Sequence, residues 1–272
     1  MISRLIDRLS RSWKLSNFLT RIPQKRTIRT TDGTRFWDSD YYRIGQGAYE
    51  GYQEQQMIRY LDEFYWKCFF YLSANRINGD YVEFGSGSNI RSFRLAHKYK
   101  RLEKLPLSLF AFDSFEGLPE PTGIDGHEAW QKGGMAVSLE EFQAVLAHQG
   151  AGPGDFQAVA GFYEETLRDH SPADYGIEKA AFVMIDCDLY ASASLALEFV
   201  ASILDDGSII ALDDWFCFSG DPERGEQLAF REFLVNHPEL SVSEFLQFGW
   251  HGKSFLVHRP KNKAEKESNL PR

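Results

Sequence analysis

The chain has 272 residues, of which 43% are hydrophobic and 15% aromatic, so it can bury the core of a sizeable domain. Its formal net charge of −9 argues against general binding to nucleic acid. No stretch approaches the ~18 apolar residues that span a bilayer, and no signal-peptide core is present. The three cysteines form no CxxC pair, which favours a reducing compartment, and we expect a cytoplasmic protein.

The first segment is basic although the whole chain is acidic. Residues 1–30 hold eight Lys or Arg and one Asp, a balance of +7 that leaves −16 on the rest. Apolar residues recur there at helical spacing, namely Ile2, Leu5, Ile6, Leu9 and Trp13. Two interpretations stay open: an interfacial helix on an anionic membrane surface, or an arm that docks on the domain or on a partner subunit of a homo-oligomer. Residues 31–259 are predicted to form one folded domain, and residues 260–272 a disordered tail.

The predicted domain starts with a helix over residues 54–74, which carries aromatic and apolar side chains at three- and four-residue spacing. Residues 79–89 (GDYVEFGSGSN) are typical of a short strand that enters a glycine-rich turn, and a helix over 90–100 follows. Glycines let the main chain approach a ligand, and a helix N-terminus offers free N–H groups, so the turn indicates a nucleotide-type site. A dinucleotide fingerprint would need glycine where the chain has Ile90, which disfavours a nicotinamide enzyme.

A second strand is predicted over residues 107–112, and it ends in Asp113, 26 residues beyond Gly87. An acid at the end of the second strand holds a ribose diol in nucleotide-binding α/β folds. The loop that follows runs to Gly134, and a loop of this length in a compact domain is usually either a functional lid or disordered. A helix over 138–148 and a strand over 156–160 come next.

Two buried strands later in the chain end in carboxylates. Residues 181–185 (AFVMI) are a continuous apolar run that breaks into Asp186. A helical segment follows, which we expect Asp206-Gly207 to end, and a second strand from Ser208 leads into Asp213-Asp214. This unit predicts a right-handed crossover between parallel neighbours, so the three carboxylates should meet at the sheet edge where α/β proteins bind ligands. A helix over 223–236 and strands over 242–248 and 254–258 complete the domain.

The clustered acids indicate a metal site. Without a counter-ion, the carboxylates of Asp186, Asp213 and Asp214 would repel one another, whereas a hard cation such as Mg²⁺ or Ca²⁺ could be shared by all three. The alternative is that each acid caps the turn or helix that follows it. For Asp188 three roles stay open: a hydrogen-bond partner of the metal ligands, a catalytic base, or a helix N-cap.

With these motifs in place, the chain resembles class I S-adenosylmethionine-dependent methyltransferases, and more narrowly the macrocin O-methyltransferase (TylF-like) family. The narrower resemblance rests on three motifs in the family's order and spacing: FDSFEGLP at 112–119, IDCDLY at 185–190 and DDW at 213–215. It covers roughly residues 54–258, within the domain over 31–259. It implies an α/β, Rossmann-like methyltransferase sheet of mostly parallel seven strands with an antiparallel last pair and helices on both faces.

The resemblance also implies an activity and a site. The activity would be the methylation, by S-adenosyl-L-methionine and with Mg²⁺ or another divalent cation, of a hydroxyl, expected on the sugar of a small molecule or glycoconjugate. By matching positions, the metal ligands look like Asp186, Asp213 and Asp214, and the cofactor contacts look like Glu83, Gly85, Gly87 and Asp113.

The base that takes the hydroxyl proton is predicted to be Asp186 or Asp188, and His127 and His251 are the other candidates. A competing hypothesis is a non-catalytic subunit that keeps the methyltransferase fold for binding, at a membrane through the basic arm. The retained carboxylates favour the enzyme, because a scaffold has no need of three clustered acids.

Overall fold

The computed structural model describes residues 27–29, 35–37, 48–86, 90–128, 130–152 and 154–259. The predicted tail over 260–272, most of the basic arm over 1–30 with its expected contacts, and Gly87 lie outside the described residues. Contacts divide the chain into two units between Arg59 and Tyr60. In the first unit, β1 (Thr27–Arg29) pairs antiparallel with β2 (Arg35–Trp37). None of the helices in the described ranges is long and apolar enough to cross a membrane.

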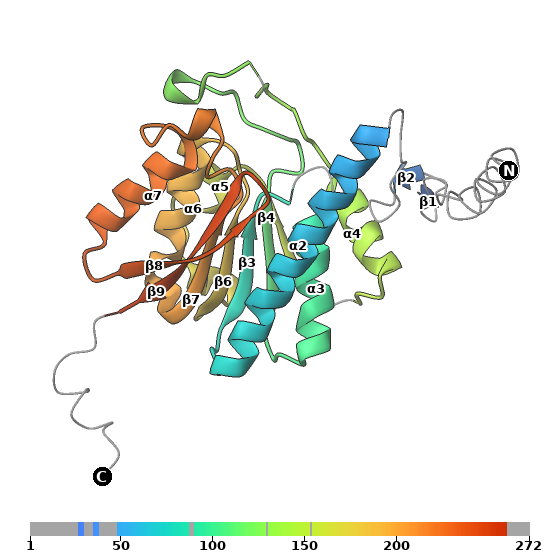
Figure 1. Cartoon of the computed structure of the whole chain (residues 1–272), viewed down its shortest axis with the longest axis horizontal. Coiled ribbons are helices and arrows are strands. Elements are labelled where there is room, and N and C mark those ends of the chain that lie inside the picture. Colours follow the sequence, from blue (N-terminus) through green and yellow to red (C-terminus); the bar gives the residue numbers. More distant parts are fainter. Residues whose placement is uncertain are drawn as a thin grey trace, which may run out of the picture. The chain divides into compact units, whose positions relative to one another are not determined.

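The second unit contains a mixed sheet of seven described strands in the order β5-β4-β3-β6-β7-β9-β8 (Figure 1). Five of them run parallel: β3 (Asp80–Phe84), β4 (Leu109–Asp113), β5 (Gln157–Ala160), β6 (Ala180–Ile185) and β7 (Leu204–Leu212). β9 (Gly252–His258) runs antiparallel to both β7 and β8 (Ser241–Phe248). The predicted sheet is therefore confirmed. Its chain order reverses between β3 and β6, which places the ligand-binding edge at the carboxyl ends of these two strands.

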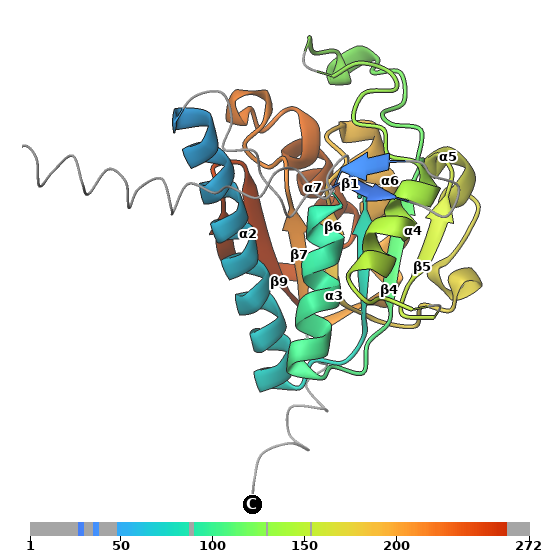
Figure 2. The same cartoon turned by 90° about the vertical axis from the view of Figure 1, so that its right-hand side faces the viewer.

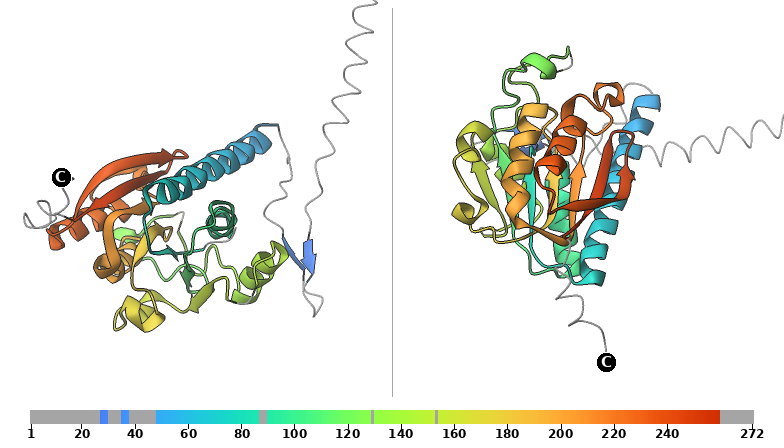
Figure 3. Two further views of the ribbon diagram at one scale, coloured as in Figure 1. Left: turned by 90° about the horizontal axis from the view of Figure 1, so that it is seen from below. Right: turned by 90° about the vertical axis from the view of Figure 1, so that its left-hand side faces the viewer.

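Helices cover both faces of the sheet, as predicted. α3 (Arg91–Glu103), α4 (Leu139–His148) and the part of α2 (Ala48–Asn75) that follows Arg59 lie on one face (Figure 2). α5 (Tyr163–Thr166), α6 (Tyr190–Val200) and α7 (Gly225–Asn236) lie on the other (Figure 3, right). The central strands are therefore covered on both sides. All six residues of β6 are buried, which explains the unbroken apolar run in its sequence.

Aromatic side chains fill the core on both faces. On the α2 face, Phe64 and Phe69 pack edge-on against Phe182 of β6. On the α6 face, Phe199 packs edge-on against Phe84 of β3. Full burial of a side chain of this size stabilises the fold by about 1.5–3 kcal/mol. The packing thus fixes the two central strands whose carboxyl ends carry the site.

One predicted boundary is wrong. The sequence predicts that Asp206-Gly207 ends the helix, whereas α6 ends at Val200 and, after a short 3₁₀ turn, β7 begins at Leu204. The β6–β7 register shifts here because the residues that follow Leu204 bulge out of the ladder. Gly207 has a φ of +84°, and the Ser208 hydroxyl closes the bulge by donating to a β6 carbonyl at 2.6 Å. The turn signal marks a β-bulge. The other predicted elements are present with shifted ends, the largest shift being α2, which begins at Ala48.

Candidate active site

The acids after β6 and β7 are held by the sheet itself. Asp186 is the first residue beyond β6, and its N–H donates to the Phe84 carbonyl at 2.8 Å. Asp213 is the first residue beyond β7, and its N–H donates to the Ile185 carbonyl at 2.9 Å. Inter-strand bonding therefore continues one residue past each strand, and it fixes the main chain of both acids at the switch-point edge.

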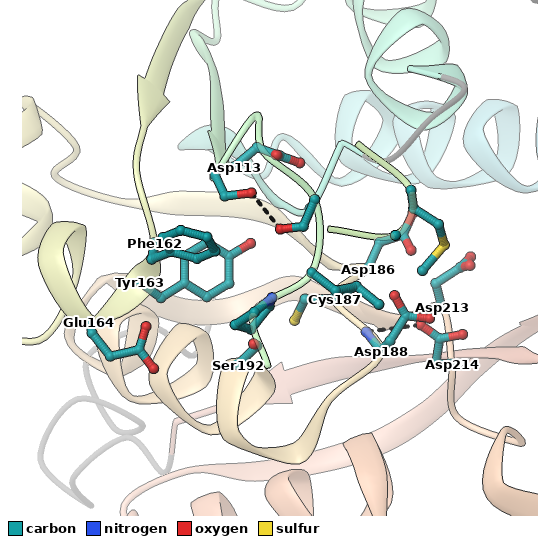
Figure 4. Close-up of a pocket in the computed structure, with 17 residues that line it drawn as sticks. Asp113, Phe162, Tyr163, Glu164, Asp186, Cys187, Asp188, Ser192, Asp213 and Asp214 are labelled. Carbon is teal, nitrogen blue, oxygen red and sulfur yellow. Dashed lines mark hydrogen bonds between the residues drawn. The ribbon is translucent and has the colours of Figure 1, made fainter. Parts of the chain in front are cut away.

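The structure brings the three predicted metal ligands together. Asp186, Asp213 and Asp214 each offer one carboxylate oxygen, and these atoms all lie within 4.8 Å of one another. Asp188 joins the group, since its N–H donates to Asp214 Oδ2 at 3.2 Å (Figure 4). Asp188 has a φ of +59°, a left-handed conformation that non-glycine residues seldom adopt, so the packing around it holds its backbone in place.

Burial and mutual repulsion raise the pKa values of these carboxyls. The pKa of Asp186 is held well above its usual range, first by burial and then by the charges of Asp213 and Asp214. Burial and the charge of Asp213 raise the pKa of Asp214 to about 7. Burial also raises the pKa of Asp213, and the nearby His251 opposes this shift. A cluster of oxygen donors whose charges repel one another fits a hard divalent cation, which would neutralise them.

Two further residues hold this cluster, and the sequence gives no clear sign of either. Glu226, in the first turn of α7, is 1% exposed, and its Oε2 accepts the N–H of Asp214 at 2.9 Å. An acid in the first turn of a helix is common because it interacts favourably with the helix dipole, so the position of Glu226 in the sequence did not indicate a role at the acid cluster. The indole Nε1–H of Trp130 donates to Asp188 Oδ1 at 2.5 Å. The length of the loop that carries Trp130 was the only sign of a role.

That long loop, predicted to be a lid or disordered, is fastened to the acid edge over its described residues. The buried carboxylate of Asp125 accepts the N–H groups of Tyr190 and Ala191, at 2.6 and 3.1 Å, at the start of α6. Arg224, which precedes α7, donates to two main-chain carbonyls of the loop at 2.8 and 2.9 Å. Trp130 stacks on Phe218, with ring centroids 4.7 Å apart. These contacts hold the loop as a wall beside the acids.

A pocket lies at this edge of the sheet, and the turns after β3 and β4 form the end of it that is away from the acid cluster. Gly85, Asp113 and Ser114 line it, and the four acids after β6 and β7 line its other end (Figure 4). Asp113 Oδ2 accepts the N–H of Ser86 at 2.7 Å, and its Oδ1 accepts the N–H of Phe115 at 2.6 Å. Asp113 therefore joins the turn after β3 to the turn after β4 at this end of the pocket.

Glu83, also predicted as a cofactor contact, is not among the residues that line the pocket. It is fully buried, and it accepts hydrogen bonds from the Tyr81 hydroxyl and from the Ser92 hydroxyl, the latter at 2.8 Å. Burial raises its pKa to about 8. Of the four predicted cofactor residues, the structure therefore places Gly85 and Asp113 at the pocket.

The two histidine candidates for the base are placed differently. His127 is exposed on the long loop, and its ring packs edge-on against Trp130 at 4.6 Å. His251, in the turn between β8 and β9, lies with its Nδ1 2.7 Å from the carbonyl oxygen of Asp213. The two aspartate candidates, Asp186 and Asp188, both have their carboxylates at the acid cluster.

These features define the class of protein. A sheet in this strand order, with a ligand-binding edge formed by a glycine turn and acidic strand ends, is the class I methyltransferase fold. The O-methyltransferase NovP shares it, with a TM-score of 0.61, 20% identity, and coverage of 73% of this chain and 79% of NovP. Calicheamicin methyltransferase CalS11 has a TM-score of 0.59 and 20% identity, covering 77% of this chain and 80% of CalS11. At this level of identity the similarity concerns the fold.

The sequence comparisons identify one family within this fold class. The profile of the macrocin-O-methyltransferase (TylF) family matches residues 58–232, more than half of the chain, and the chain belongs to this family. A curated relative from Streptomyces olivaceus, 8-demethyl-8-(2,3-dimethoxy-alpha-L-rhamnosyl)-tetracenomycin-C 4'-O-methyltransferase, is 30% identical over 154 residues. The match covers 52% of this chain and 55% of that relative, so it spans about half of each. The predicted family and fold are both confirmed.

Proposed function

We propose that the protein transfers a methyl group from S-adenosylmethionine to a hydroxyl on the sugar of a small molecule or glycoconjugate, and that it requires a divalent cation. Membership of the macrocin-O-methyltransferase family supports the reaction type. The curated relative is named for methylation of a rhamnosyl group, which supports a sugar as acceptor.

The observation that carries the proposal is that one pocket is lined by two different groups of residues. Its lining joins Gly85 and Asp113 at one end to the carboxylates of Asp186, Asp188 and Asp214 at the other. The first end is suited to a nucleoside, because an acid after the second strand binds a ribose diol. The second end is suited to a cation and a hydroxyl. A donor and an acceptor bound in one pocket are held close enough to react.

Each residue then has a stated task. Asp113 would bind the ribose of S-adenosylmethionine, whose sulfonium supplies an electrophilic methyl group. Asp186, Asp213 and Asp214 would hold a cation, which lowers the pKa of a nearby hydroxyl. We assign Asp188, whose Oδ1 accepts the indole N–H of Trp130, as the base that takes the hydroxyl proton, and Asp186 is the other candidate. Bound in this pocket, S-adenosylmethionine would supply the methyl group, whose bond to the acceptor oxygen would form as its bond to sulfur breaks and leaves a neutral thioether.

The competing hypothesis of a non-catalytic subunit gains no support from the site. Half-buried carboxylates that repel one another destabilise a fold, so a protein that only binds partners would gain nothing from keeping four of them at one edge. Each of the four lines the pocket.

The test is transfer of a radiolabelled methyl group from S-adenosylmethionine to a panel of rhamnosylated small molecules, with Mg²⁺ or with EDTA. We expect Mg²⁺-dependent labelling of at least one rhamnoside, and Asp188→Asn should lower the rate by about 10²–10⁴-fold because it removes the base. The exposed Asp169→Asn is the matched control and should behave as the wild type. Full activity in EDTA would refute the metal requirement, and full activity of Asp188→Asn would refute the assignment of the base.

A further inference from the structure

The turn between β8 and β9 reaches the acid cluster because of how the sheet ends. β9 runs antiparallel to β7, so it begins at the edge where β7 stops. Leu212, the last residue of β7, pairs with Lys253 near the start of β9. The turn that precedes β9 therefore lies beside Asp213, although the two are far apart in sequence. His251 is the residue of this turn that contacts the acids.

His251 binds the acid-bearing loop at two points. Its Nδ1 lies 2.7 Å from the carbonyl oxygen of Asp213 and 3.4 Å from the Asp213 Oδ2. Because a carbonyl oxygen can only accept a hydrogen bond, Nδ1 must carry the proton that it donates. The carbonyl of His251 accepts the N–H of Phe216 at 2.9 Å. One residue thus holds the loop at Asp213 and again three residues later.

The imidazole ring is itself fixed. It is part of a residue that is 8% exposed, and it packs edge-on against Tyr60 and Phe248, with ring centroids 6.3 and 6.2 Å away. A ring held on two aromatic neighbours keeps its Nδ1–H in one direction. Asp213 needs such a support, because its side chain keeps 20% of its surface exposed and its neighbours in the cluster repel it.

We propose that His251 is a positioning residue for the metal site: its Nδ1–H donates to the carbonyl of Asp213, and its Nδ1 lies 3.4 Å from Oδ2 of the same residue, so the ring holds Asp213 with its carboxylate beside Asp186 and Asp214. This inference rests on the cation requirement in the proposed function. His251 does not touch the cation or the acceptor in this role. Residues that orient metal ligands in this way typically change metal affinity by about 10–100-fold when they are replaced.

The test is calorimetric titration of the full chain with Mn²⁺, which requires no acceptor. The variants are His251→Ala, His251→Phe and His251→Asn, with Asp213→Asn as the reference for a lost ligand. Phe keeps the packing on Tyr60 and Phe248 but has no donor. Asn places an amide N–H close to the position of Nδ1. Melting temperatures in EDTA and affinity for S-adenosylmethionine report on the fold of each variant.

We expect His251→Phe and His251→Ala to weaken Mn²⁺ binding by about 10–100-fold, with affinity for S-adenosylmethionine unchanged. His251→Asn should restore affinity to within a few-fold of the wild type. If His251→Ala fails to fold, the comparison of Phe with Asn decides the question alone. The inference would be overturned if His251→Phe bound Mn²⁺ as tightly as the wild type, or if His251→Phe and His251→Asn lost equal Mn²⁺ affinity. In either case, loss of Mn²⁺ binding in Asp213→Asn would still support the cation site itself. A wild type that binds no Mn²⁺ would overturn the cation requirement and this inference with it.

Discussion

Gly85 and Asp186 approach so closely that a Cβ atom on Gly85 would lie 1.8 Å from the carbonyl oxygen of Asp186. Gly85 also has a φ of +84°, which L side chains rarely adopt. The turn after β3 and the turn after β6 therefore meet main chain to main chain. This contact joins the end of the pocket that Asp113 lines to its acid end.

Gly85→Ala should consequently lower the free energy of unfolding by about 3 kcal/mol or more, because it adds a backbone clash to an unfavourable φ. Gly123→Ala is the matched control: Gly123 has a φ of +60°, but a Cβ there meets nothing within 4 Å. Gly123→Ala should lower the free energy of unfolding by only about 1–2 kcal/mol, because an alanine there must adopt a left-handed backbone conformation. Denaturant unfolding measures both. Equal losses would show that the approach to Asp186 imposes no constraint.

The acid cluster predicts a stability that depends on metal. Asp186→Asn removes one repelling charge without changing the shape of the side chain, so in EDTA the variant should be more stable than the wild type by about 1–3 kcal/mol. Added Mn²⁺ should reverse the order, since a ligand at 1,000 times its Kd stabilises the native state by about 4.1 kcal/mol and only the wild type binds it well. Thermal unfolding in EDTA and in MnCl₂ tests this. The same order under both conditions would contradict the metal site.

Glu83 predicts a pH dependence of stability. Burial raises its folded-state pKa from 4.5 to about 8, so between these values the folded protein binds a proton that the unfolded chain has lost. The contribution of Glu83 is therefore fully present below pH 4.5 and is lost as pH rises through about 8. At 1.36 kcal/mol per unit, the loss is at most about 5 kcal/mol.

Glu83→Gln removes the titrating group, and rotation of the Tyr81 and Ser92 hydroxyls can pair the new amide. Relative to the wild type, this variant should gain stability steadily from pH 5 to pH 8 in denaturant unfolding. The reason is that rising pH favours the unfolded wild type, in which Glu83 can ionise, and the variant has no such group. The exposed Glu120→Gln should follow the wild type at every pH. Parallel curves for Glu83→Gln and the wild type would show that Glu83 does not titrate in this range.

The bond between Trp130 and Asp188 can be measured by a double-mutant cycle. Trp130→Phe keeps an aromatic ring on Phe218 but loses the indole donor. Its coupling with Asp188→Ala in the free energy of unfolding should be about 1–3 kcal/mol, as for a hydrogen bond to a half-buried carboxylate. Trp66→Phe, at a side chain that is 46% exposed, should show additivity with Asp188→Ala. Additivity in the Trp130 cycle would mean that the loop does not hold Asp188.

The sequence predicts the parts of the fold and site that depend on local patterns. The apolar run before Asp186 and the run before Asp213 identify buried parallel strands, and an acid directly after such a strand must lie at the sheet edge. The three predicted metal ligands are therefore found together. Asp113 was found in the same way, from the end of the second strand.

The contacts that orient these acids depend on long-range packing, which local patterns do not show. Trp130 lies 58 residues from Asp188, and His251 lies 38 residues from Asp213. Nothing in the sequence around either residue indicates its partner. The Asp206-Gly207 signal was misassigned for a related reason, because a turn signal does not distinguish the end of a helix from a bulge in a strand.

The central claim is that one pocket holds a nucleoside end and a metal end, and calorimetric titration of the full chain with S-adenosylmethionine and, separately, with Mn²⁺ tests it most directly. We expect the wild type to bind both. Asp113→Ala should lose at least about tenfold in affinity for S-adenosylmethionine, equal to about 1.4 kcal/mol, and keep Mn²⁺ binding. Asp213→Asn should lose Mn²⁺ and keep S-adenosylmethionine. A wild type that binds neither, or Asp113→Ala and Asp213→Asn variants that bind both as the wild type does, would contradict the account.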